Sequence, residues 1–330
     1  MWHYRSMKSH LKRSPALLVK KIGLRRTKRL ITCRRALMRK RKEVRHKSTV
    51  SRKDEKEMSG AKDYGSFCQR LDLDDDEFEA EKSDLLKSLA LNDEEKALVE
   101  VATRGQRENS RWLEERKVRL TASNFGLICK RRSKSLWAPV VKQLLYNKIS
   151  TDAMMYGELN ESAAIQCFED KLNTKVLPCG LFVDKAIDFL AASPDGVVGE
   201  EDIVEVKCPK SAELLTIPEA VKQIKSFCLA PCKSSNDIKL KRNHNYYYQV
   251  QGQLHISNKR RCYFVVWTKK DIHIEAIERD DKFWKEKMEK PLCFFYKCAL
   301  LPEIVDPRTC RSMPIREPNI SLPEFKLDEH

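Results

Sequence analysis

The chain has 330 residues, of which 41% are hydrophobic, which is enough for one large domain or two small ones with a buried core. It contains no apolar run of about 18 residues, so a membrane-spanning helix is excluded. The net charge of +16 is concentrated: residues 1–50 hold 18 Lys or Arg and one acid, leaving 46 basic and 47 acidic residues in 51–330. Outside the tail, any site for an anion must therefore gather its positive charge locally.

The N-terminal tail has no acid before Glu43 and only brief apolar groups, so it is predicted to be disordered or loosely helical alone. Three interpretations compete. The run RRALMRKRKEVRHK at 34–47 is typical of a nuclear-localisation signal or a nucleic-acid patch, whereas the acid-poor start is typical of a mitochondrial transit peptide. The third is a solvated extension without a role. We favour a nuclear location, with the mitochondrion as the alternative.

A boundary is predicted between an acidic linker and the first folded element. Residues 51–91 become acidic, with LDLDDDEFEAEKSD at 71–84, and we expect residues 1–91 to lie outside the folded domain. Asn92 is followed by three acids and then by apolar residues at helical spacing. This pattern is typical of a capped helix N-terminus, so the domain is predicted to begin at residue 92.

Basic side chains lie beside a predicted helix start within residues 103–132. Arg116 and Arg119 come just before Thr121 and Ser123, either of which can cap a following helix. Backbone amides at such a helix start attract phosphate, and nearby arginines add to that attraction. Taken alone, the pattern favours surface arginines and a simple capping serine.

Residues 154–172 are predicted to form a helix, because Ile165, Phe168 and Leu172 make an apolar stripe. Glu158 and Glu161 lie three residues apart and share a face of this helix. Solvated glutamates are the ordinary interpretation of such a pair.

A charged hairpin follows. Phe189–Ala192 is predicted as a strand, then come a Pro-Asp-Gly turn, a polar loop and a second strand, Ile203–Lys207. Alternate strand residues share a face, so Glu205 and Lys207 point one way and the intervening valines point into a core. Asp195, at the end of the preceding strand, is then expected beside Glu205.

Two carboxylates at that distance raise each other's pKa unless a cation lies between them. Oxygen ligands without imidazole or thiolate favour Mg²⁺ or Mn²⁺. Lys207 can orient or polarise an attacking water. A bare Glu-x-Lys would fit an ordinary polar hairpin, but the full set of Pro-Asp, nine residues and Glu-x-Lys is uncommon by chance.

The sequence SPDG followed by VEVKCP resembles the catalytic hairpin of the PD-(D/E)xK nucleases, and more closely that of the lambda-exonuclease-like, YqaJ viral recombinase group. The resemblance covers about Thr103 to Tyr296 and implies a metal-dependent nuclease. It implies that Asp195, Glu205 and the Val206 carbonyl hold one or two metal ions, and that Lys207 positions the attacking water.

The resemblance also implies a site for the DNA end. In the family, an R-x6-S arrangement near the start of the domain binds the 5′-phosphate, and Arg116 with Ser123 matches this spacing. Arg119 is a second candidate.

Two further site residues are implied. A glycine followed four residues later by a glutamate supplies another acid to the family's metal site, and Gly157 with Glu161 fits this pattern better than Glu158 does. The helix HNYYYQVQGQLHIS at 244–257 resembles the family's helix with a Q-V-Q element. Gln249 matches the active-site glutamine, and Gln251 is expected to face elsewhere.

The remaining elements complete an α/β domain over residues 92–298. Apolar patterns predict strands at 262–268 and 271–277 and a helix at 278–298. The order of elements predicts a mixed central β-sheet flanked by helices, as in a restriction-endonuclease-like core. Beyond Ala299 an extended tail is expected from five prolines: Pro302, Pro307, Pro314, Pro318 and Pro323.

The resemblance implies a magnesium-dependent DNA nuclease, specifically a 5′→3′ exonuclease on duplex ends in recombination or end processing, and this is our hypothesis. An endonuclease on the same core is one alternative, and a catalytically silent DNA-binding module of viral or transposon origin is another. The 12 cysteines are spread singly, which favours reduced intracellular thiols. A homo-oligomer is possible for the family, but no interface pattern indicates one.

Overall fold

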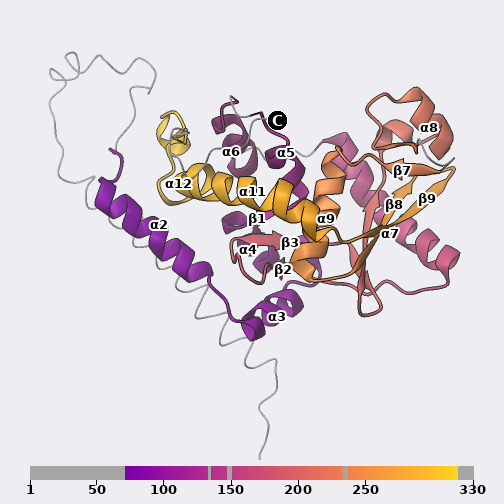
Figure 1. Cartoon of the computed structure of the whole chain (residues 1–330), viewed down its shortest axis with the longest axis horizontal. Helices are drawn as coiled ribbons and strands as arrows, with labels where there is room; N and C mark the ends of the chain where they lie inside the picture. Colours follow the sequence, from indigo (N-terminus) through magenta and orange to yellow (C-terminus); the bar gives the residue numbers. More distant parts are fainter. Residues whose placement is uncertain (1–70, 133–134, 147–150, 233–236, 319–330) are drawn as a thin grey trace, which may run out of the picture. The chain divides into compact units, whose positions relative to one another are not determined.

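The protein is described here from a computed structural model, which defines residues 71–132, 135–146, 151–232 and 237–318 (Figure 1). The described residues all fall within one compact unit that spans 63–330. The basic tail, with its predicted disorder and its nuclear, mitochondrial and DNA-binding interpretations, lies outside the described residues. Within the described ranges, no helix is both long and apolar enough to span a membrane.

A mixed four-stranded sheet forms the centre of the fold. Its strands are β4 (Gly196–Val198), β5 (Asp202–Lys207), β8 (Arg261–Trp267) and β9 (Ile272–Glu278), and they lie in that order. β5 pairs antiparallel with β4 and parallel with β8, and β8 pairs antiparallel with β9. The predicted α/β class with a mixed sheet flanked by helices is confirmed.

Two small sheets lie beside the central one. β3 (Leu190–Ala192) pairs parallel with β1 (Leu120–Thr121) and antiparallel with β2 (Phe182–Val183), while β6 (Leu229–Pro231) pairs with β7 (Ile238–Leu240). The predicted pairing of strand 189–192 with strand 203–207 is therefore wrong. The hairpin partner of β5 is the short strand β4, which the Pro-Asp turn separates from β3.

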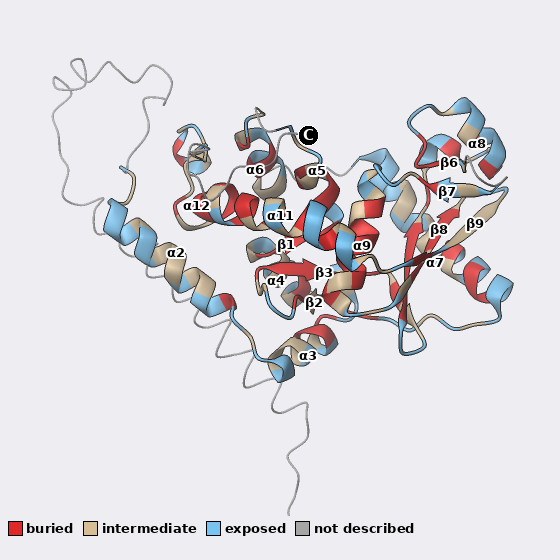
Figure 2. Cartoon of the chain, in the orientation of Figure 1, coloured by how far each residue is buried: buried red, intermediate tan, exposed pale blue. Residues whose placement is uncertain are grey.

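Helices cover both faces of β5. On one face α7 (Asp152–Leu172) packs through Phe168 against Val204, Val206 and Val265. On the other face α9 (Asn245–Ser257) packs against alternate residues of β5 and β8. Figure 2 shows α9 buried over most of its length. Four further helices precede α7 in the chain: α3 (Asp93–Ala102), α4 (Ser110–Val118), α5 (Phe125–Cys129) and α6 (Ala138–Leu145). The short helix α8 (Ile217–Gln223) follows β5.

The folded domain begins earlier than residue 92. A helix α2 (Asp75–Leu89) precedes it, capped by the Asp74 side chain, with three acids in its first turn. The acidic run predicted as a linker therefore acts as a helix start, where carboxylates are favoured by the helix dipole. Leu89 is 3% exposed and belongs to the large core cluster, whereas most of the rest of α2 is open to solvent (Figure 2).

The domain also ends later than residue 298. α10 (Asp281–Phe283) continues through a short π-helical segment into α11 (Glu289–Phe295). A second π-helical segment then leads into α12 (Leu301–Val305). The extended tail predicted beyond Ala299 is wrong here because Pro302 lies in the first turn of α12, where a backbone N–H is not needed.

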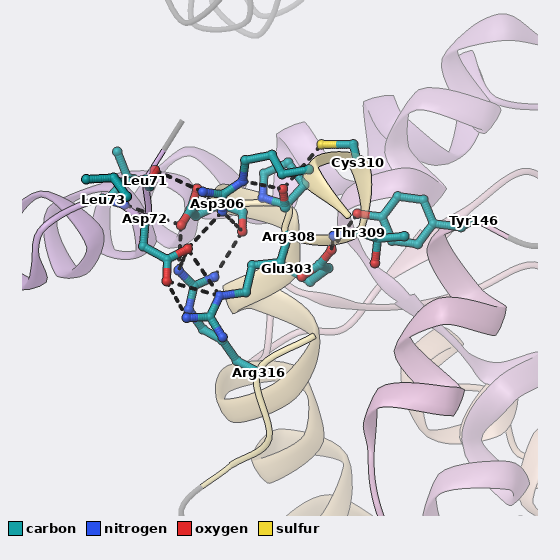
Figure 3. A network of polar contacts seen from close by, with 12 residues as sticks. Leu71, Asp72, Leu73, Tyr146, Glu303, Asp306, Arg308, Thr309, Cys310 and Arg316 are labelled. Carbon is teal, nitrogen blue, oxygen red and sulfur yellow. Dashed lines mark hydrogen bonds and ion pairs between the residues drawn. The ribbon is translucent and has the colours of Figure 1, made fainter. Parts of the chain in front are cut away.

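An ion-pair network joins the two ends of the domain (Figure 3). Asp72 binds Arg308, Arg311 and Arg316, and the latter two also bind Asp306. The hydrogen bond from Arg308, reinforced by the neighbouring charges, lowers the pKa of Asp72 to about 2. Both boundary predictions are therefore wrong for the same reason. The two segments that were predicted to lie outside the domain, one before residue 92 and one after residue 298, are ion-paired with each other and belong to the fold.

The buried end of α2 leads to a stability prediction. Leu89→Ala should lower the free energy of unfolding by about 2–4 kcal/mol, because it removes a buried side chain and leaves a cavity. Leu71→Ala is the matched control, since Leu71 is 83% exposed and should change the stability little. Denaturant unfolding of the two variants measures the difference. Equal effects would show that α2 does not contribute to the core.

Candidate active site

The hairpin brings Asp195 beside β5 through two backbone contacts. The Asp195 N–H donates to the Val204 carbonyl at 3.1 Å, and the Val206 N–H donates to Asp195 Oδ2 at 2.7 Å. The carboxylate is therefore held next to Glu205, the residue between these two partners. The expected neighbourhood of Asp195 and Glu205 is thus present in the structure, although the strand that leads into it differs.

Glu205 is a buried carboxylate surrounded by donors. It is 2% exposed, and its Oε1 accepts hydrogen bonds from Gln249 Nε2 at 2.6 Å and from Lys207 Nζ. Its Oε2 accepts a bond from Gln253 Nε2 at 2.6 Å. Both carboxylate oxygens of this buried side chain therefore have hydrogen-bond donors, which offset the cost of burying them.

Gln253 was missed by the sequence analysis. It lies one turn after Gln249 on α9, and residues four apart share a face of a helix, so the spacing Q-V-Q-G-Q contained the signal. Gln251 faces elsewhere, as expected: it donates to the Glu278 carbonyl at 3.0 Å and accepts from the Asp280 N–H.

Lys207 lies against the same carboxylates and above an aromatic ring. Its Nζ is 4.8 Å from the centre of the Tyr246 ring, and it is ion-paired with Glu205. Burial alone would lower the pKa of Lys207, but the charges of Glu205 and Asp195 outweigh burial and hold it above its usual value. Lys207 is therefore a fixed cation and donor, not a base.

The other two acids of the site, Asp195 and Glu161, both have raised pKa values. Burial raises the pKa of Asp195 well above its usual range, and the Glu205 charge raises it further despite Lys207. Burial likewise raises the pKa of Glu161 on α7, although the charge of Arg107 opposes it. Glu158 instead forms an ion pair with Arg107 at the surface. Glu161 is the acid of that pair whose charge is felt at Asp195.

The donor set fits a hard divalent cation. In the described parts of the chain, no three His, Cys, Asp or Glu side chains form a ready-made metal cage. Mg²⁺ does not require one, because it binds through one or two carboxylates and completes its shell with water and substrate phosphates. Asp195 and Glu205 supply that number. The ligand roles of Glu161 and of the Val206 carbonyl stay predictions.

The residues predicted to bind phosphate, Arg116, Arg119 and Ser123, lie in different environments. The Arg116 guanidinium stacks on the Trp112 ring at 4.2 Å, and the Trp112 Nε1 donates to Ser193 Oγ at 2.8 Å. Burial, with a smaller effect from the charge of Arg107, lowers the pKa of Arg116 to about 10, so it remains cationic near neutral pH. Ser193 precedes the Pro-Asp turn by one residue, so Arg116 is positioned relative to Asp195.

Arg119 and Ser123 lie in different surroundings from Arg116. Arg119 is 3% exposed, is ion-paired with Glu115 and donates to the Asp188 carbonyl at 2.9 Å, so its cation is used inside the fold. Ser123 is exposed, and its Oγ lies 3.3 Å from Thr121 Oγ1. Among the described residues, no hydrogen bond joins Ser123 to Arg116.

A second contact holds the turn that carries Asp195. Gln106 donates from Nε2 to the Pro194 carbonyl at 2.8 Å and to the Cys179 carbonyl at 3.3 Å. Gly105 before it has φ +88°, a left-handed conformation that favours glycine. The segment that carries Arg107 and leads to Arg116 is therefore tied directly to the turn that carries Asp195.

With this geometry in place, the chain can be compared with known proteins. Residues 111–260 match the family model of the YqaJ-like viral recombinase domain. This segment is a YqaJ-like viral recombinase domain. It includes every residue placed around Asp195 above except Gln106 and Arg107, which lie just before it.

Relatives of the YqaJ-like domain include two viral proteins. The alkaline nuclease of Orgyia pseudotsugata multicapsid polyhedrosis virus is 28% identical over 57% of this chain and 47% of its own length. The alkaline nuclease of Autographa californica nuclear polyhedrosis virus is 24% identical over 61% of this chain and 54% of its own length. The chain thus spans about half the length of these relatives.

Solved structures are also similar to part of the chain. The alkaline exonuclease LHK-Exo from Laribacter hongkongensis aligns with a TM-score of 0.44 at 23% identity, and the alignment covers 59% of this chain and 93% of that one.

The amide donors lead to a prediction on metal affinity. Gln253→Leu should weaken Mg²⁺ binding by about 10–100-fold, because it removes the donor that orients one oxygen of Glu205. Gln251→Leu is the matched control on the same helix, since its hydrogen bonds lie near Glu278 and Asp280. Calorimetric titration with Mg²⁺ measures both affinities, and equal losses would contradict the assignment of Gln253 to the site.

Proposed function

We propose that this chain is a metal-dependent DNA nuclease. The observation that carries the proposal is the junction of Asp195, Glu205 and Lys207 on one hairpin, with both carboxylates held in place by backbone and amide donors. The match to the YqaJ-like domain and the similarity to two viral alkaline nucleases support the same chemistry. We further propose Mg²⁺ as the cofactor, with Mn²⁺ as a substitute, because all the available ligands are oxygens.

The protein residues have separate roles in this proposal. Asp195 and Glu205 bind the cation and are kept in position by the Val206 N–H and by Gln249 and Gln253. When bound, a divalent cation would lower the pKa of a coordinated water and stabilise negative charge on the phosphate. Lys207, a permanent donor beside Glu205, orients the attacking water. Burial of these groups strengthens each of the contacts by lowering the local dielectric constant.

We propose 5′→3′ digestion of duplex ends as the specific reaction, in recombination or end processing. Support comes from Arg116, a partly buried cation linked through Trp112 to the catalytic turn, which offers a charge for a terminal phosphate. Endonuclease action on the same core and silent DNA binding are outcomes of the first test below. A nuclear location is proposed from the basic tail alone, with the mitochondrion as alternative, and a homo-oligomer remains a proposal from family resemblance.

The first test compares linear with closed-circular duplex DNA in the presence of Mg²⁺. The intact chain should degrade only the linear form, while nicking of circles would favour the endonuclease. Lys207→Ala should slow the reaction by about 10²–10³-fold, the usual cost of removing one preorganised donor from a reaction centre. Asp195→Asn should abolish it. Binding without cleavage by the intact chain would favour the silent module, and undiminished cleavage by both variants would refute the site.

The second test concerns the strand end. Arg116→Ala should erase any preference for 5′-phosphorylated over 5′-hydroxyl duplex, because a charge-assisted contact contributes roughly 1.5–3 kcal/mol. Lys117→Ala, on the exposed side of the same helix, is the control and should keep the preference. Initial digestion rates of the two substrates measure the ratio. A preference that survives Arg116→Ala would assign the end to another residue.

A further inference from the structure

We propose a second phosphate-binding subsite, formed by Lys130, Lys241 and His244 beside Lys207, which holds the DNA backbone next to the scissile phosphate. The inference rests on the proposed nuclease function and adds a strand contact separate from the Arg116 site. We call these three residues the lysine patch. They come from the end of α5, the loop after β7 and the residue before α9.

Close helix packing positions the first member of the lysine patch. A Cβ on Gly126 of α5 would lie 2.5 Å from the Asn245 Cα, and a Cβ on Gly252 of α9 would lie 2.4 Å from the Phe125 ring. The two glycines therefore allow α5 to approach the first turns of α9. Lys130, which follows α5, then reaches Asn245 Oδ1 with its Nζ at 3.0 Å.

The second member is held by backbone carbonyls. Lys241 Nζ donates to the Phe227 carbonyl at 2.6 Å and approaches the Lys225 carbonyl at 3.5 Å. In the described ranges, neither Lys130 nor Lys241 forms an ion pair with a carboxylate. Arg242, directly after Lys241, is instead neutralised by Asp280 at 2.8 Å. The lysine patch thus keeps its positive charge, whereas its neighbour does not.

The pKa of His244 indicates that the charges of these lysines lie close to its ring. Burial lowers the pKa of His244, and the charges of Lys130, Lys241 and Lys207 all lower it further. The imidazole is therefore neutral near pH 7. Its Nδ1 accepts the Tyr246 N–H at 3.2 Å, which leaves Nε2 protonated and able to donate to an anion.

The lysine patch continues directly from the reaction centre. The Tyr246 ring contacts both Lys207, at 4.8 Å, and the His244 ring, at 4.5 Å between ring centres. Residues 51–330 carry 46 basic and 47 acidic side chains, so this part of the chain has no overall positive charge and must gather cations locally to bind an anion. Two ammonium groups and one neutral N–H donor are the kind of groups that contact backbone phosphates without reading sequence.

The test uses the full chain with Asp195→Asn, so that DNA is bound and not cut. Lys130→Gln with Lys241→Gln removes both charges but keeps a donor for each present acceptor, and Lys130→Arg with Lys241→Arg keeps the charges. Lys171→Gln with Lys185→Gln removes two charges from exposed positions elsewhere. Binding to a short 5′-phosphorylated duplex is measured over a range of salt concentrations, with circular dichroism to confirm folding.

The glutamine pair in the lysine patch should lower the log–log salt slope by about 1–2, since each phosphate contact contributes about 0.9 for duplex DNA. The arginine pair should keep the slope of the parent protein, and so should the Lys171 and Lys185 pair. A folded glutamine pair with an unchanged slope overturns the subsite and leaves the proposed function intact. If the parent protein does not bind DNA at all, the proposed function fails, and the subsite fails with it.

Discussion

The buried carboxylate of Glu205 is the constraint on which the rest of the site depends. It lies on a strand that is covered on both faces, where an ionised acid is costly unless every oxygen has a donor. Gln249 and Gln253 meet this requirement from one helix, and Lys207 meets it from the same strand. α9 must therefore pack against β5 at one rotation only, because a shift of one residue would point both amides away from the acid.

The elements around this strand bring groups that lie far apart in the sequence to one place. α7 packs on the valine face of β5 and carries Glu161, while the hairpin places Asp195 across from Glu205. The segment before α4 is tied to the same turn, through Gln106 to Pro194 and through Trp112 to Ser193. Arg116 and Asp195 are thus connected through the Trp112 ring and a neutral hydrogen bond, which keep their relative position without neutralising either charge.

The sequence predicted the parts of the site that are set by local spacing. Asp195 and Glu205 are brought together by a hairpin, whose geometry follows from alternation and a turn. Gln253 was missed because α9 is buried on nearly all sides, so that no apolar stripe marks the face turned to β5. The pairing of β3 with β1 was not predictable in this way, because its partner lies about 70 residues earlier in the chain. Local rules for acidic runs and prolines failed at both ends of the domain, since tertiary contacts there decide the outcome.

The charges of the site are not balanced by the protein alone. Lys207 brings one positive charge to Asp195, Glu205 and Glu161, and the pKa values of Asp195 and Glu161 remain raised in its presence. Either protons or an added cation must supply the remaining positive charge, and both would occupy the same carboxylate oxygens. At low pH protons occupy these oxygens, and as the pH rises the protons leave and the oxygens become available to a cation. The proposed cation would therefore bind better under alkaline conditions, because the acids are buried together and not because any one of them is unusual.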